Sequence, residues 1–393
     1  MLGDGVLALP RLGGVLQTGE PGLPSVVVDG RGVEVEAVSQ FLRDLMLCDM
    51  SPATCRSYAH DLLRWFRLLW LLGMGWERAT TSEVALLVGW LRSAPNPQRR
   101  RSPDSTVVAG EVNVRTGKPA LPAGYSRSTI NHALTVVSQF YAFHAHAGRG
   151  PVVNPVPERP DRRRALTHRS PIDPVRRHRR APLRQRVVEA APRSIPDAMW
   201  DELFAAVGHD RDRALLELFV STAARAEELL GLRMDDVDWA GQRIWVVSKG
   251  SRLRQLVPAS PQGLVWLARY LHAVGPPPPG APIWRTMDGR QSPLTYGALR
   301  RTLQRANERL GTNWTAHDLR HTAAMRMAGD PSLTVVDVQT VLRHGHLTST
   351  QRYFRPRIDE VIEKLHGHFD CPQPPPRPAP GYAAEDLHVV FGG

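Results

Sequence analysis

The feature that most restricts the fold of this chain is a segment near its middle, residues 151–195, that is crowded with proline and arginine. Proline removes a backbone donor and like charges repel one another, so such a segment is unsuited to regular structure. Between Arg159 and Arg186 it holds eleven arginines against two acidic residues. The 393-residue chain is therefore predicted to form two units, each able to bury a core, joined by a solvated linker.

Helical periodicity dominates the residues before this linker. Apolar side chains over residues 35–45 recur on one helical face, and Ser51-Pro52 has the N-cap and first-turn proline of a helix start. Further helices are expected from Thr81 and from Ser126, separated by a long loop or small hairpin over residues 96–124. The prediction is a small helical bundle over residues 33–150, preceded by a flexible tail over residues 1–32.

The second unit is predicted over residues 196–370 and is again mostly helical. Its helices are expected over residues 196–207, 211–223, 261–274, 294–309, 316–328 and 334–343. One hairpin interrupts them, with strands at 243–247 and 253–257. The fold class is therefore mainly α with a small antiparallel sheet, and a proline-rich tail follows over residues 371–393.

Charge is the strongest compositional clue to a partner. The net charge of +12 and the isoelectric point near 10.4 favour a polyanion, and the charge of the linker favours a path along a phosphate backbone. Only three lysines occur, at Lys118, Lys249 and Lys364. The three cysteines have no metal-ligand spacing, and no apolar stretch approaches a membrane span. We expect a protein of the cytoplasm, associated with the nucleoid, with no membrane contact.

Four short pieces of the second unit carry residues suited to phosphate chemistry, in a fixed order. They are residues 222–232 with Arg225 and Glu228, the turn Ser248-Lys249-Gly250, the helix start His317-Asp318-Leu319-Arg320, and Leu342-Arg343-His344, followed nine residues later by Tyr353. Guanidinium groups stay charged and offer a two-pronged donor to phosphate oxygens. Because His317 and Arg320 are three residues apart, they share a helix face and can meet the same phosphate.

This ordered set resembles the catalytic domain of the tyrosine recombinases, the phage integrase family, whose pattern is Arg, Lys, His-x-x-Arg, Leu-Gly-His, Tyr. Residues 51–66 and 124–141 resemble the family's helical core-binding domain, in a form common among transposon- and phage-borne members. The resemblance implies a core-binding bundle at the N-terminal side, followed by a mainly helical catalytic domain. It also implies a site-specific recombinase of a mobile element, acting in integration, excision or transposition.

The resemblance also assigns roles to individual residues. Tyr353 would attack phosphorus and form a 3′-phosphotyrosine, while Lys249 would protonate the leaving 5′ oxygen. Charge that develops on the phosphate would be met by Arg225, Arg320, His317 and His344. His317 could accept or share the proton of the phenol, and Glu228 would brace the site. The covalent bond conserves the energy of the phosphodiester, so neither a metal ion nor another cofactor is needed.

One position departs from the family pattern, because Arg343 stands where glycine usually precedes the second histidine. Arg343 could contact a phosphate or shift His344, and His346 is a rival for the role of His344. Arg56 and Arg127 in the first unit, with Arg343 in the second, are the candidate DNA-binding arginines.

The implied partners are double-stranded DNA at specific sites and other copies of the chain, in a tetramer assembled on DNA, with accessory recombination proteins possible. Two alternatives stay open. A type IB topoisomerase uses a similar site on one duplex, without a specific sequence. A disabled relative would bind DNA and not cut it, and only Arg343 favours that interpretation.

Overall fold

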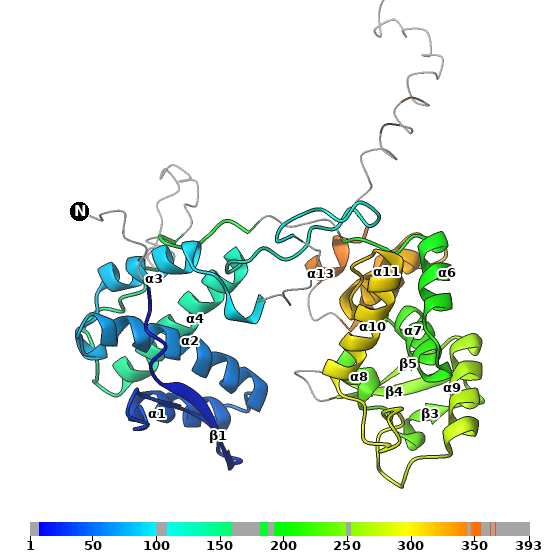
Figure 1. Ribbon diagram of the computed structural model, residues 1–393, viewed down its shortest axis with the longest axis horizontal. Coiled ribbons are helices and arrows are strands. Elements are labelled where there is room, and N and C mark those ends of the chain that lie inside the picture. Colours follow the sequence, from blue (N-terminus) through cyan, green and yellow to red (C-terminus); the bar gives the residue numbers. More distant parts are fainter. Residues whose placement is uncertain are drawn as a thin grey trace, which may run out of the picture. The chain divides into compact units, whose positions relative to one another are not determined.

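The computed structural model describes residues 8–99, 108–158, 181–187, 192–248, 253–343 and 347–354, together with residues 362 and 366 (Figure 1). It divides into two compact units, Met1–Glu189 and Ala190–Gly393. The division falls inside the predicted linker. Residues 181–187 of that linker pack on the first unit, where the backbone N–H of Gln185 donates to the side-chain oxygen of Asn131 at 2.7 Å.

Four helices of the first unit confirm the predicted bundle: α1 (Glu36–Leu47), α2 (Pro52–Leu71), α3 (Thr81–Ser93) and α4 (Arg127–His146). Short 3-10 turns lie at Trp76–Arg78 and Pro97–Arg99. The expected N-cap forms at α2, where the hydroxyl of Ser51 accepts from the backbone N–H of Thr54 at 3.2 Å. In the core the indole of Trp65 donates to the hydroxyl of Tyr141 at 3.1 Å, so α2 and α4 share both apolar area and a satisfied polar contact.

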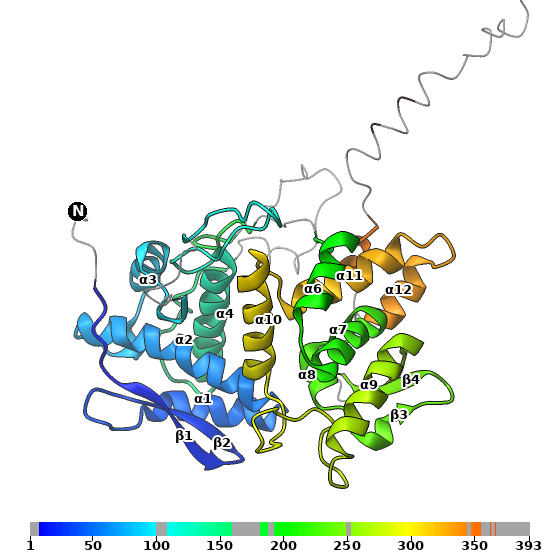
Figure 2. The same cartoon turned by 45° about the vertical axis from the view of Figure 1, so that its right-hand side comes forward.

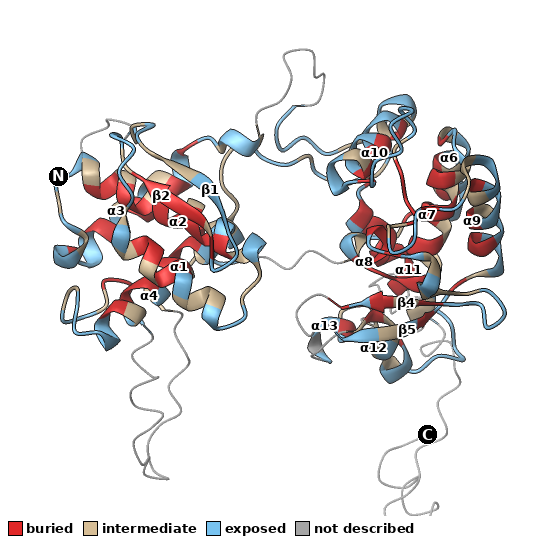
Figure 3. Cartoon of the chain, turned by 90° about the horizontal axis from the view of Figure 1, so that it is seen from below, coloured by how far each residue is buried: buried red, intermediate tan, exposed pale blue. Residues whose placement is uncertain are grey.

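The prediction of a flexible tail over residues 1–32 is wrong for residues 14–28, and residues 1–7 lie outside the described part of the chain. Strands β1 (Gly14–Glu20) and β2 (Leu23–Val28) form an antiparallel hairpin, and its second strand buries Leu23, Val26 and Val27 (Figure 3). The run of β-branched residues in β2 suits a buried strand, and Pro21-Gly22 supplies the reversal between the strands. The hairpin packs on α1 and α2, so it is part of the first core.

The second unit contains eight described α-helices and a three-stranded antiparallel sheet. The helices are α6 (Asp197–Ala206), α7 (Asp210–Thr222), α8 (Ala226–Leu230), α9 (Pro261–Val274), α10 (Tyr296–Leu310), α11 (Ala316–Ala328), α12 (Val335–Leu342) and α13 (Thr348–Gln351). The strands are β3 (Val237–Asp238), β4 (Arg243–Val247) and β5 (Arg254–Pro258), in the order β3-β4-β5, and a 3-10 turn at Met234–Asp236 leads into them. The mainly α fold with a small sheet is confirmed, and the short β3 is an addition to it.

Helix α7 lies at the centre of this unit. It packs on α9 and on α11, and α11 in turn contacts α12 (Figure 2). Both α7 and α11 are largely buried, which leaves the outer faces of α9, α10 and α12 to solvent (Figure 3). The C-terminal end of α7 is therefore enclosed by the elements that carry the sequence motifs. Within the described ranges, no helix is both long and apolar enough to cross a bilayer.

Candidate active site

The first motif lies where α7 ends and α8 begins. Helix α7 ends at its C-cap residue Ala223, whose backbone is left-handed with φ 50° and ψ 27°. The chain changes direction there, and two residues later Arg225 is the N-cap residue of α8. The guanidinium of Arg225 is part-exposed, with 34% of its side chain accessible. It is therefore held at the edge of the core, where a ligand can reach it.

Glu228 forms an ion pair with this arginine. Its carboxylate is almost fully buried and lies 2.8 Å from Nη1 of Arg225, and it also accepts the backbone N–H of Arg225 at 2.8 Å. Its second cation is Arg343, at 2.7 Å. Burial alone would raise the pKa of Glu228, but the charge of Arg343 and the hydrogen bonds from Arg225 lower it below the ordinary value. Glu228 therefore stays ionised at neutral pH, and its role in bracing the site stays a prediction.

Arg320 contacts the C-terminal ends of two helices, α7 and α12. It lies on α11, is buried, and donates to the carbonyl oxygen of Ala223 and, at 2.6 Å, to that of Leu342 at the end of α12. Burial, followed by the nearby charges of Arg225 and Arg343, lowers its pKa to about 10. The guanidinium is still charged at neutral pH, so a fixed cation lies next to Arg225.

Tyr353 follows α13 and is only 6% exposed. Its ring packs in a small cluster with Ala323, Ala324 and Leu342, and its hydroxyl lies 2.7 Å from Nδ1 of His321. Burial raises the pKa of the phenol, although the charges of Arg352 and Arg320 oppose this. The phenol is therefore neutral at neutral pH and directly in contact with a buried imidazole.

His321 is the site residue that the sequence analysis missed. It lies one helical turn after His317, and the centroids of the two rings are 4.2 Å apart. Burial, with the adjoining His317 and Arg352, lowers the pKa of His321 to about 4. The i, i+4 spacing puts His321 on the same side of α11 as His317, which is exposed, and this spacing was available in the sequence. A role for His317 on the phenol stays a prediction.

Other predicted site residues are either undescribed or lie elsewhere. Lys249 and His344 fall outside the described residues, although the strands β4 and β5 that flank Lys249 form the expected hairpin, closed by the backbone N–H of Ser248 donating to Leu253 at 2.9 Å. Arg56 and Arg127 are exposed in the first turns of α2 and α4. In contrast, only 3% of the Arg343 side chain is accessible.

Comparison with known proteins agrees with this arrangement. The profile of the phage integrase family matches residues 197–359, and the profile of the phage integrase N-terminal SAM-like domain matches residues 38–104. Tyrosine recombinase XerC of Pelobacter propionicus is 30% identical over 170 residues, which are 42% of this chain and 55% of that protein. Tyrosine recombinase XerD of Lacticaseibacillus casei is 34% identical over 163 residues, 40% of this chain and 54% of that protein. The chain thus spans about half the length of the curated relatives it matches.

Two solved structures have the same fold at low sequence identity. A lambda integrase fragment, solved as a dimer bound to a COC' core site, has a TM-score of 0.54 at 16% identity and covers 82% of this chain and 95% of its own. The Tn1549 transposon integrase, solved with circular intermediate DNA, has a TM-score of 0.54 at 13% identity over 84% of this chain and 98% of its own. The two profile matches fall one in each unit, and the match over residues 197–359 contains Arg225, Glu228, Arg320 and Tyr353. The chain therefore belongs to the phage integrase family, the tyrosine recombinases.

Proposed function

We propose that this protein is a site-specific recombinase that breaks and rejoins double-stranded DNA through Tyr353. The observation that carries the proposal is one cluster in which the buried phenol of Tyr353, the guanidinium of Arg320 and the Arg225–Glu228 pair come together. Arg225 and Glu228 come from the start of α8, Arg320 comes from α11, and Tyr353 lies two residues after α13. Fixed cations beside a nucleophile are what phosphoryl transfer needs, because charge grows on the phosphate oxygens.

In this mechanism the Tyr353 oxygen forms a bond to phosphorus while the bond from phosphorus to the 5′ oxygen breaks. The part-exposed Arg225 would bind a non-bridging oxygen, and the buried Arg320 would supply a second positive charge. His317 would accept or share the proton that the phenol loses, Lys249 would give a proton to the 5′ oxygen, and His344 would add a donor to the phosphate. Attack by a 5′ hydroxyl on the 3′-phosphotyrosine reverses the step, so no outside energy source is needed.

The neutral state of the phenol fits this chemistry. A phenol with a raised pKa is a poor nucleophile until it gives up its proton. The adjacent imidazole of His321, with its pKa lowered to about 4, is a weak proton acceptor. Cleavage would then depend on DNA being seated in the site.

The proposed partners follow from the family and the charge. We infer double-stranded DNA with specific recombination sites, a tetramer assembled on that DNA, and action in the cytoplasm at the nucleoid. Integration, excision or transposition of a mobile element is the proposed biological role.

Covalent trapping on nicked duplexes tests the proposal. The duplexes would be drawn from DNA flanking the gene, and wild type would be compared with Tyr353→Phe on denaturing gels. Tyr296→Phe is the matched control, because Tyr296 is an exposed tyrosine at the start of α10. We expect a detergent-resistant adduct with the wild type and with Tyr296→Phe, and none with Tyr353→Phe.

Two other outcomes favour the alternatives. Tight binding without an adduct in any of the three proteins indicates a disabled relative. Relaxation of a supercoiled plasmid that lacks the flanking DNA, at the rate seen with it, indicates a topoisomerase.

A further inference from the structure

Arg343, which stands where the family usually has glycine, has an unfavourable backbone for its residue type. It ends α12 in the left-handed region, with φ 53° and ψ 47°. This conformation costs a residue with a Cβ about 1 kcal/mol or more relative to glycine. The arginine side chain must therefore contribute an interaction that glycine cannot make.

The side chain of Arg343 turns inward and not toward solvent. Nη1 donates to the carbonyl oxygen of Val341 at 2.7 Å, and Nη2 donates to Oε2 of Glu228 at 2.7 Å. With 3% of the side chain accessible, these donors are not presented to a ligand. A direct phosphate contact, which the sequence allowed, does not fit this geometry.

The pairing decides how Glu228 can hold Arg225. Oε2 of Glu228 already accepts from Arg343 and from the backbone N–H of Arg225, while Oε1 accepts from Nη1 of Arg225 at 2.8 Å. A two-pronged clamp of the Arg225 guanidinium on both oxygens would have to displace those donors. Because Arg343 and the backbone N–H of Arg225 both occupy Oε2, the Arg225 guanidinium is bound through Oε1 alone.

We propose that Arg343 is a positioning residue that acts through Glu228 to hold Arg225 in the orientation that meets the phosphate. The proposal rests on the recombinase function proposed above. It also links two motifs, because Arg343 precedes His344 at the end of α12 while Glu228 and Arg225 lie at the start of α8. A shift of Arg343 would therefore move the Glu228 carboxylate and, with it, Arg225.

A double-mutant cycle tests the proposal. Arg343→Gly, Glu228→Gln and the double variant would be compared in single-turnover cleavage of nicked duplex at saturating DNA, in DNA affinity over a range of salt, and in thermal unfolding. Arg343→Lys keeps the charge without the fork. Arg326→Ala is the control for loss of an ordinary ion pair, since Arg326 pairs with the exposed Asp197.

We expect Arg343→Gly to lower the cleavage rate roughly tenfold, with little effect once Glu228 is already replaced. DNA affinity and its salt dependence should not change, Arg343→Lys should recover part of the rate, and Arg326→Ala should cleave like the wild type. Weaker binding with a salt slope reduced by about one would assign a phosphate contact to Arg343 and overturn the proposal. An equal loss of rate in the Glu228→Gln background would overturn it as well.

Failure of the recombinase function gives a different result. The wild type would then form no adduct on any duplex, while unfolding would still report the Arg343–Glu228 pair. Coupling seen in unfolding alone would give Arg343 a purely structural role and reject the positioning role.

Discussion

His321 lies 2.7 Å from the hydroxyl of Tyr353 and yet stays uncharged at neutral pH. A histidine in water takes up a proton near pH 6.5, whereas in the folded protein burial and cationic neighbours lower the pKa of His321 to about 4. Between these two values the unfolded chain binds a proton at this position and the folded chain does not. The fold is therefore penalised as the solution becomes acidic, and the penalty is absent above pH 6.5.

A pH-dependent stability follows at this residue. The shift corresponds to a loss of about 3 kcal/mol at most between pH 6.5 and pH 4. His321→Asn keeps a polar partner for the phenol and removes the titration, so its unfolding temperature should fall less over this pH range than that of the wild type. Thermal unfolding at pH 7.0, 5.5 and 4.5 would measure this, and parallel curves for the two proteins would contradict it.

At the scale of elements, the hairpin β1–β2 is the least expected part of the first unit. Val27 on β2 is fully buried, whereas Leu16 on β1 is 53% exposed. Strand β2 thus packs on α1 and α2, while β1 pairs with β2 and is mostly exposed to solvent.

Truncation of a single side chain tests whether the hairpin is structural. Val27→Ala removes two buried methyl groups and should lower the unfolding free energy of the first unit by about 2 kcal/mol. Leu16→Ala, on the exposed strand, should change it by about 0.5 kcal/mol or less. Urea denaturation followed by tryptophan fluorescence would compare the two variants, and equal stabilities would show that the hairpin is only loosely attached.

The sequence predicted the helices well because their apolar faces and caps are local signals. It predicted the β4–β5 hairpin for the same reason, but missed β1–β2, where glycine and proline outweighed the β-branched run over residues 26–28. At the site, the order of motifs predicted Arg225, Arg320 and Tyr353 as neighbours. The inward turn of Arg343 depends on a left-handed backbone and on Glu228, more than a hundred residues away, and no local pattern carries that information.

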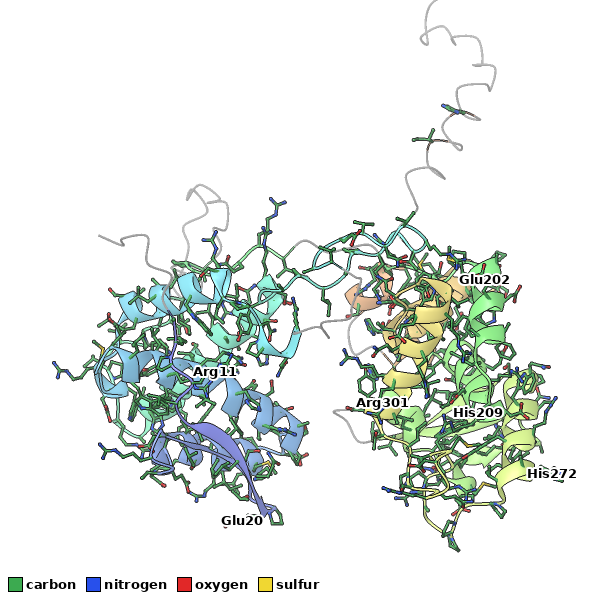
Figure 4. All side chains as sticks on the ribbon, in the orientation of Figure 1. Arg11, Glu20, Glu202, His209, His272 and Arg301 are labelled. Atoms are coloured by element: carbon green, nitrogen blue, oxygen red, sulfur yellow. The ribbon has the colours of Figure 1, made fainter. Side chains whose placement is uncertain are left out.

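At the scale of the whole molecule, charge governs the encounter with DNA. The net charge of +12 comes mainly from arginine, and many arginines are exposed, including Arg300 and Arg305 on α10. Arg301 on the same helix is also exposed (Figure 4). Each arginine that neutralises a phosphate releases counterions, so binding should weaken steeply as salt rises.

Single substitutions can separate contributing arginines from the rest. We expect Arg301→Ala to weaken binding to all duplexes and to reduce the slope of log affinity against log salt by about one. Arg269→Ala should leave the slope unchanged, because Arg269 is paired with Asp210 and lies over the ring of Trp266. Fluorescence anisotropy over a salt series would give both slopes, and identical slopes would remove α10 from the contact surface.

The order of the two cores along the chain has a consequence for synthesis on the ribosome. One core uses residues before Glu189, and the other begins at Ile195. At ordinary elongation rates the second unit takes roughly 10–40 s to translate, which is ample time for the first to fold while still tethered. Translation that stopped between the units would release a complete bundle without Tyr353. Such a product would keep the exposed Arg56 and Arg127 of the first unit and lack every residue of the candidate active site.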